Sequence, residues 1–369
     1  MTKVLAPAAL AAALAFAAPA VAQSLPDYYP KDYSQIVEGS KKENKLVVYS
    51  IMAEYNWRPV IEGFKKKFPW IDVQTLDLGS GEVFERYYAE RASGARSGDL
   101  MINGAVDKWL QFVGRGELVD YVSAEAAKVP DWSKPRKGLY TVSADPMVIV
   151  YNKALIPEAQ APKSLADLAK MVSAAPARFK NKITTYNAGT EAFGLAINWA
   201  YVKSKGDAAW GLLEQMGKVV RAEGSAGPMV EKITAGEYMA GYFISAIVLY
   251  PRLNDPARAK ILGWAFPTDG TPIIMRGMGI AKGATNVNSA KLMLDHILSH
   301  EGQVAFGKGG LTPYRADVKD DEVPRYTFSR VAREAGGEQN LVIVDYDDNI
   351  VSKGPDFQAR WKKVFGTGG

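Results

Sequence analysis

The pattern of apolar positions predicts two buried strands around which the chain is organised. Residues 146–153 (PMVIVYNK) contain an unbroken apolar run rich in β-branched side chains, which is typical of a strand buried on both faces. A second run of this kind occupies residues 273–282 (IIMRGMGIAK). The chain between the two runs is long enough to form a separate α/β lobe. We therefore expect two lobes joined by crossing strands, with a ligand cleft between them.

Strand and helix patterns alternate on both sides of the first run. Residues 46–50, 71–76 and 99–102 are expected as strands, and residues 57–68, 82–93 and 106–113 have helical spacing. Residues 51–56 have no apolar period and are expected as a loop. In the second lobe we expect strands at residues 182–186, 219–222 and 238–244. This order predicts parallel sheets covered by helices, in which the strand ends line a crevice.

We assign the fold class as α/β with two lobes, each a mixed and mostly parallel sheet flanked by helices. Residues 23–143 and 267–369 form one lobe, and residues 144–266 form the other. The hinge strands cross between the lobes. We expect a monomer, and no fixed-period repeat stands out in the chain.

The N-terminus has the three parts of a secretory signal peptide. Lys3 supplies positive charge, residues 4–18 are apolar, and an Ala-x-Ala sequence ends at Ala22. A membrane anchor is the alternative, but Pro7 interrupts the short run and Pro19 ends it. We expect residues 1–22 to be removed and the mature chain to be periplasmic in a bacterial source.

Composition excludes several classes of site. The 369 residues include no cysteine and two histidines, so thiolate metal sites and cysteine nucleophiles are absent. The net charge of +5 favours anions, but no basic block with interleaved aromatics indicates nucleic-acid binding. No nucleophile elbow, phosphate-binding P-loop or zinc-protease motif is found. We therefore expect no enzyme activity, no cofactor and no resident metal.

Two loops have the form of an anion site. Gly79, Ser80 and Gly81 follow one predicted strand, and Gly189 with Thr190 follows another. Each loop opens a helix, where free backbone N–H groups and a hydroxyl can bind an anion. Plain helix capping by the hydroxyl is the alternative explanation for each loop.

Further candidate ligand contacts are charged, aromatic or polar residues near strand ends. Arg221, Arg252 and Arg276 could pair with a carboxylate or phosphate, although a surface arginine is the ordinary alternative. A tyrosine could present its ring or hydroxyl to a ligand, although core tyrosines are commoner. The rest of the candidate set is Ser50, Tyr55, Asn103, Tyr186, Tyr242 and Ser245.

His296 and His300 leave one enzymatic alternative open. They are spaced i, i+4 on one predicted helix, near Asp295 and Glu301. This face could bind a metal or support a secreted hydrolase, but helix surface is the simpler interpretation.

The chain resembles bacterial extracellular solute-binding proteins of the ferric-iron type. The match follows the family in order over nearly all of the mature chain, although each piece is short. Its segments are residues 42–50, 88–91, 97–100, 150–153, 161–168, 235–237, 267–271, 280–284, 290–291 and 298–303. The resemblance implies a type II periplasmic-binding-protein fold and a role in an ABC importer, with lobes that close on a ligand by a hinge.

The resemblance also implies that this chain lacks the ferric ligands of the family. Members that hold iron use a His after the first strand, a Glu after the third and adjacent tyrosines after the Gly-Glu strand. Here residues 51–56 contain no His, Asn103-Gly104 follows the third strand, and residues 243–247 contain no tyrosine. Relatives also bind phosphonates, phosphorylated sugars, thiamine and other small ions.

We expect a substrate-binding component that delivers a small anionic solute to an inner-membrane ABC permease. An organic acid, a phosphonate or a phosphate ester would suit the two loops. A ferric-ion carrier that uses tyrosines is the alternative, and a secreted hydrolase is the second alternative.

Overall fold

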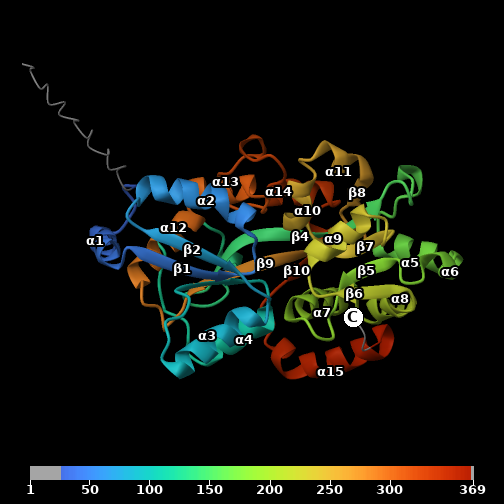
Figure 1. Ribbon diagram of the computed structural model, residues 1–369, viewed down its shortest axis with the longest axis horizontal. Coiled ribbons are helices and arrows are strands. Elements are labelled where there is room, and N and C mark those ends of the chain that lie inside the picture. Colours follow the sequence, from blue (N-terminus) through green and yellow to red (C-terminus); the bar gives the residue numbers. More distant parts are fainter. Residues whose placement is uncertain (1–25, 367–369) are drawn as a thin grey trace, which may run out of the picture.

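The computed structural model describes residues 26–366, so the expected signal peptide lies outside the described residues. Figure 1 shows an elongated α/β molecule in which helices cover both faces of the central strands. The strands are β1 (Lys45–Ser50), β2 (Asp72–Asp77), β3 (Leu100–Asn103), β4 (Tyr140–Asn152), β5 (Ile183–Tyr186), β6 (Val220–Glu223), β7 (Ala240–Ser245), β8 (Leu262–Ala265), β9 (Thr271–Ile280) and β10 (Leu341–Val344).

Helices connect these strands and continue beyond them. They are α1 (Tyr33–Glu43), α2 (Glu54–Lys67), α3 (Glu82–Ser93), α4 (Val106–Gly114), α5 (Leu165–Ala174), α6 (Pro176–Phe179), α7 (Ala192–Lys205), α8 (Asp207–Gly217), α9 (Ala226–Thr234), α10 (Ala246–Arg252), α11 (Pro256–Ile261), α12 (Val287–Leu298), α13 (His300–Lys308), α14 (Phe328–Glu334) and α15 (Asn349–Phe365). None of them, within residues 26–366, is both long and apolar enough to cross a membrane.

The strand order is β2-β1-β3-β9-β4-β7-β5-β6, with β10 added to β9 and β8 added to β4. The pairs β1–β2, β1–β3, β5–β6 and β5–β7 are parallel, whereas β9 runs antiparallel to β3 and β4. The predicted α/β class with mixed, mostly parallel sheets is therefore confirmed.

The long strand β4 joins the two halves of this order. Its first part pairs with β9, and its second part pairs with β7 and β8. All of its residues are buried, as the apolar run of residues 146–153 predicted, but the strand begins earlier, at Tyr140. The second predicted run corresponds to β9, which is also buried throughout.

The expected loop at residues 51–56 is wrong in its second half, because α2 begins at Glu54. The first turn consists of Glu54, Tyr55 and Asn56, which show no apolar periodicity. The acidic Glu54 nevertheless favours a helix start, because it lies at the positive end of the helix dipole. Asn56 is buried in this turn, and its Nδ2 donates to the carbonyl of Gly309 at 2.7 Å. Tyr55 and Asn56 are thus held on a helix start.

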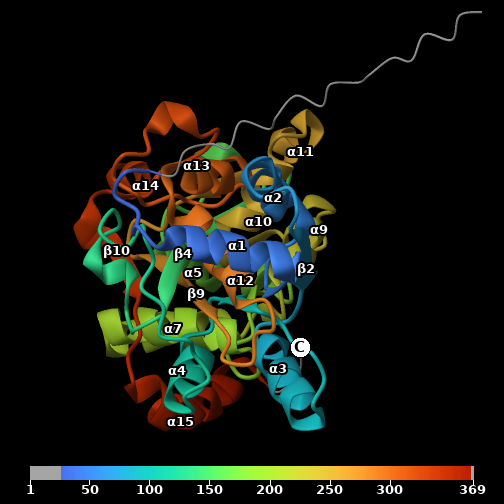
Figure 2. The ribbon, with the colours of Figure 1, turned by 90° about the vertical axis from the view of Figure 1, so that its left-hand side faces the viewer.

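The C-terminal helix α15 contacts helices from both parts of the chain. It packs on α7 and α8 and also on α4. Figure 1 shows α15 below α7 and α8, and Figure 2 shows it below α4. The lobe boundaries at residues 143–144 and 266–267 stay a prediction.

Candidate ligand-binding site

A cavity of about 470 Å³ lies where the carboxyl ends of several strands meet. Its walls are built from the segments that follow β1, β2, β5, β6 and β7, together with one residue of β9. In open α/β sheets this edge is the usual place for a ligand. The lining residues are Ile51, Ala53, Tyr55, Asn56, Asp77, Leu78, Gly79, Ser80, Tyr186, Glu191, Phe193, Gly224, Ser225, Ala226, Gly227, Ser245, Ile247, Val248, Arg252 and Arg276.

Arg276 is the most deeply buried charge in the cavity wall. Its side chain is 1% exposed, and its Nε donates to Asp145 Oδ2 at 3.1 Å. Among residues 26–366, no group forms a hydrogen bond with its Nη2. A buried guanidinium nitrogen without a partner is costly, and an anionic group in the cavity would satisfy it.

Asp145 holds Arg276 in this position. Its carboxylate also accepts hydrogen bonds from the backbone N–H of Thr312 at 2.9 Å and from Ser143 Oγ at 2.6 Å. Burial raises the pKa of Asp145, while Arg276 and the two donors oppose the rise. Since β4 carries Asp145 and β9 carries Arg276, the pair joins the two long strands at the cavity.

Helix starts add positive potential to the cavity. Ala53 precedes α2 and Ser225 precedes α9, and neither gives a side-chain hydrogen bond to its helix. The first backbone N–H groups of a helix have no acceptor within it. By contrast, Ser164 and Ser299 cap α5 and α13 with their hydroxyls, and neither lines the cavity. The two uncapped starts are therefore suited to an anion.

Five predicted contacts are brought together in this cavity. Tyr55 and Arg252 meet across it, with Arg252 Nη1 and the Tyr55 hydroxyl 3.4 Å apart. Arg252 Nε also pairs with Glu231 at 2.9 Å. Burial raises the pKa of Tyr186, so its hydroxyl stays neutral. The five predicted residues that line the cavity are Ser80, Tyr55, Tyr186, Ser245 and Arg252, and Arg276 from the wider set lines it too.

Several other predicted contacts face the protein interior instead. Ser50 Oγ accepts from Trp57 Nε1 at 3.0 Å. Asn103 Oδ1 accepts a hydrogen bond from the backbone N–H of Ala105, just before α4. Its Nδ2 donates to the carbonyl of Ser80, so Asn103 stabilises the loop at Gly79-Ser80-Gly81 without lining the cavity. Tyr242 is fully buried in β7. Polar residues at strand ends were thus used for internal hydrogen bonds or core packing.

The second predicted loop does not line the cavity. Gly189 lies against the side chains of Trp361 and Lys362, where a Cβ atom would come within about 3 Å of both. Thr190 and Arg221 are exposed, and Gly81 directly precedes α3, beside the side chain of Glu85. The symmetric pair of anion loops that the sequence indicated is therefore absent from this cavity.

The loop of residues 224–227 takes the place expected of Gly189 and Thr190, and it was not among the predicted anion loops. It has the same form as Gly79-Ser80-Gly81, because small residues and a serine follow a strand and open a helix. Applying that criterion to every strand end would have found it. Asp77 and Glu191 were also missed, and the only signal for them was their position, since Asp77 ends β2 and Glu191 follows β5.

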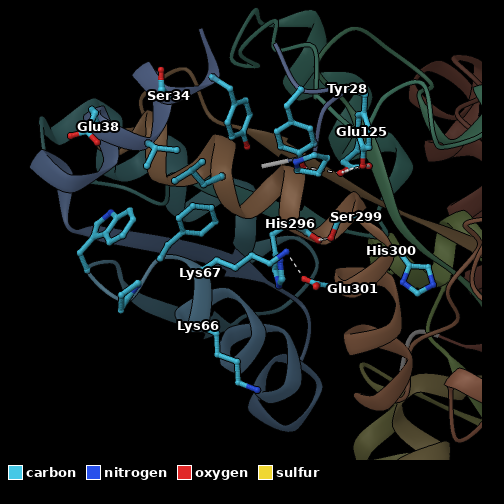
Figure 3. Close-up of a pocket in the computed structure, with 18 of the residues that line it drawn as sticks. Tyr28, Ser34, Glu38, Lys66, Lys67, Glu125, His296, Ser299, His300 and Glu301 are labelled. Carbon is cyan, nitrogen blue, oxygen red and sulfur yellow. Dashed lines mark hydrogen bonds and ion pairs between the residues drawn. The ribbon is translucent and has the colours of Figure 1, made fainter. Parts of the chain in front are cut away.

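A second cavity, of about 580 Å³, lies on another part of the molecule (Figure 3). It is bounded by α1, the end of α2, α12 and the start of α13. Lys67 forms an ion pair with Glu301 beside His296, as Figure 3 shows. No segment next to β5, β6 or β7 lines this cavity within the described residues, so it lacks the two-sided lining of the first cavity.

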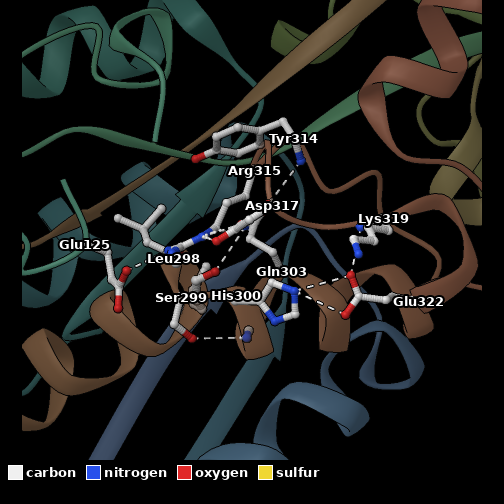
Figure 4. Close-up of polar contacts among 12 residues, drawn as sticks. Glu125, Leu298, Ser299, His300, Gln303, Tyr314, Arg315, Asp317, Lys319 and Glu322 are labelled. Atoms are coloured by element: carbon white, nitrogen blue, oxygen red, sulfur yellow. Dashed lines mark hydrogen bonds and ion pairs between the residues drawn. The ribbon is translucent and has the colours of Figure 1, made fainter. Parts of the chain in front are cut away.

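The two histidines give no support to a hydrolase. His296 Nε2 lies 3.3 Å from the carbonyl of Val60, and His300 Nε2 lies 3.2 Å from Glu322. Figure 4 shows the His300–Glu322 contact next to the buried pair of Arg315 and Glu125. Within residues 26–366, no serine or threonine hydroxyl contacts either ring, and no cluster of three His, Asp or Glu side chains suits a metal.

Comparisons with known proteins agree with this architecture. Residues 60–327 match the family described as bacterial extracellular solute-binding protein. The crystal structure of the substrate binding protein of an ABC transporter from Agrobacterium tumefaciens superposes with a TM-score of 0.76 at 22% identity, covering 87% of this chain and 94% of that one. A comparison with curated proteins gave no match.

Two further structures share the fold but are described with different ligands. The periplasmic binding protein AfuA from Actinobacillus pleuropneumoniae, with fructose-6-phosphate bound, has a TM-score of 0.70 at 20% identity, covering 88% of this chain and 99% of that one. Iron-bound HitA from Pseudomonas aeruginosa has a TM-score of 0.67 at 17% identity, covering 86% and 99%. At such identities the likeness concerns the fold, whereas the family match spans most of the sequence. The chain belongs to the bacterial extracellular solute-binding protein family.

Proposed function

We propose that this protein captures a small anionic solute in the cavity at Arg276 and delivers it to an ABC permease of the inner membrane. The observation that carries the proposal is the buried Arg276 guanidinium, whose Nη2 lacks a partner at the cavity wall. The uncapped starts of α2 and α9 support it, because they add positive potential from two directions. The family match and the fold of ABC substrate-binding proteins support delivery to a permease.

The mechanism is differential binding between two conformations. A solute that contacts segments from both sheets favours the conformation in which they approach each other. The permease recognises that conformation, and no covalent bond is made or broken. The protein acts as a periplasmic monomer after removal of residues 1–22.

A conservative substitution at Arg276 tests the anion contact. Arg276→Lys keeps the charge next to Asp145 but removes the planar fork of donors. We expect the affinity for the anionic solute to fall by about 1.5–3 kcal/mol, the usual range for hydrogen bonds to a charged group. Isothermal titration calorimetry measures the change, and circular dichroism checks that the variant is folded.

Arg221→Ala is the matched control, because Arg221 is an exposed arginine of β6 outside the cavity. Its affinity should equal that of the unmodified protein. Equal affinities for all three proteins would remove Arg276 from the site. Mass spectrometry of native and denatured protein, with metal analysis of the same sample, identifies a bound solute, and stoichiometric iron would favour the ferric alternative.

A further inference from the structure

Asp77 places an unpaired carboxylate in the same cavity. It ends β2 and lines the cavity wall next to the loop at Gly79. Within the described residues, no hydrogen bond or ion pair reaches its carboxylate. Burial alone raises the pKa of Asp77, which agrees with the absence of a nearby compensating cation. The group is therefore available to a donor that the protein does not supply.

Glu191 adds a second carboxylate without a strong partner. It occupies the N-cap position of α7, but its side chain does not cap that helix. Its Oε1 receives only a 3.5 Å contact from Thr190 Oγ1. The carboxylate lies beside Gly224, where a Cβ atom would be 3.9 Å away. Glu191 thus faces the loop that starts α9.

Each arginine of the cavity already forms an ion pair with an acidic residue that does not line the cavity. Arg276 pairs with Asp145, and Arg252 pairs with Glu231. With Asp77 and Glu191 also facing the cavity, the site has separate positive and negative parts but no excess of positive charge. A dianion would gain at Arg276 and be repelled by the two free carboxylates, because charges in a partly buried site interact strongly.

We infer that the solute is a small zwitterion, with its anionic group at Arg276 and a cationic ammonium group at Asp77 and Glu191. This inference rests on the proposed function, since it keeps the anionic contact at Arg276, and it adds a cationic group to the solute. Each end of such a molecule satisfies a group that the protein leaves without a partner. A monocarboxylate without an amino group would pair only with Arg276, and a diamine would pair only with Asp77 and Glu191.

A series of ω-amino acids from glycine to 6-aminohexanoate tests the inference. Each is compared with compounds of equal length, for example 4-aminobutyrate with butyrate, succinate and 1,4-diaminobutane, and fructose 6-phosphate represents phosphate esters. Thermal shift ranks the compounds and calorimetry measures their affinities. We expect one of the ω-amino acids to bind more tightly than its matched monoacid, diacid and diamine.

Asp77→Asn is the decisive variant, because it removes the charge and keeps the shape of the side chain. It should weaken binding of the best ω-amino acid at least about tenfold, the effect of losing one charge-assisted contact, and should not weaken binding of the matched monoacid, which loses a repulsion. Asp72→Asn, at the other end of β2 and outside the cavity, is the control and should bind normally.

The outcomes separate this inference from the proposed function. Tighter binding of succinate or fructose 6-phosphate, no binding of any ω-amino acid, or an Asp77→Asn variant with unchanged affinity would overturn the zwitterion. Anion capture at Arg276 would survive the first and third results. If 1,4-diaminobutane were the only compound that binds, and its affinity were the same for Arg276→Lys as for the unmodified protein, both the zwitterion and anion capture at Arg276 would be overturned.

Discussion

His296 shows at the scale of one residue how burial decides the charge of a side chain. It is 4% exposed, and burial, followed by the nearby Lys67, lowers its pKa from 6.5 to about 4. In the unfolded chain the ring takes up a proton near pH 6.5, so protonation favours unfolding. The neutral ring therefore contributes fully to the unfolding free energy above pH 6.5, and this contribution is lost as the pH falls toward 4. The lowered pKa corresponds to about 3 kcal/mol of unfolding free energy.

The variant His296→Phe tests this pH dependence. Phenylalanine fits the apolar surroundings, where His296 already packs against the ring of Phe64, and it cannot take up a proton. We expect the unfolding free energy of the variant to fall less than that of the unmodified protein between pH 7 and pH 4.5. Urea unfolding at several pH values measures both slopes. Parallel slopes for the unmodified protein and for His296→Phe would contradict the explanation.

At the scale of elements, strands and helices could be predicted from the periodic pattern of apolar residues. The placement of the loops could not, because it depends on contacts between residues far apart in the sequence. The buried runs predicted β4 and β9, and the helical spacing of residues 82–93 predicted α3, because periodicity is a local signal. Whether a strand-end loop faces a cavity or a distant helix is decided by packing far along the chain. Gly189 therefore lies against α15, although its local form matches that of Gly79.

Two serines that precede helices provide a matched test of capping. Ser164 Oγ accepts from the backbone N–H of Asp167 at 2.8 Å, whereas the Ser225 side chain makes no capping bond. Ser164→Ala should lower the unfolding free energy by about 1 kcal/mol. Ser225→Ala should leave it nearly unchanged, because there is no bond to lose. Chemical denaturation compares the two variants, and an equal cost for both would show that the hydroxyl of Ser225 caps α9 after all.

At the scale of the whole molecule, the strand β4 and the helix α15 connect the two parts of the strand order. The strand β4 pairs with β9 at one end and with β7 and β8 at the other. Its pairing register shifts between Val148 and Val150, which interrupts the regular ladder inside the buried strand. The helix α15 contacts α4 on one side and α7 with α8 on the other. A closing motion would have to bend β4 and slide α15, since packed interiors do not compress.

This arrangement predicts that solute binding makes the molecule more compact. The cavity proposed for the solute is lined by segments at the ends of β1 and β2 and by segments at the ends of β5, β6 and β7, so a solute bound there would favour the conformation that brings them together. Small-angle X-ray scattering should show a smaller radius of gyration at saturating concentrations of the compound that binds most tightly. Arg276→Lys at the same concentration should give an intermediate value, because less of the variant is occupied. An unchanged radius for the saturated, unmodified protein would mean that the cavity binds its solute without closure, and recognition by a permease would then have to rest on the solute-bound surface itself.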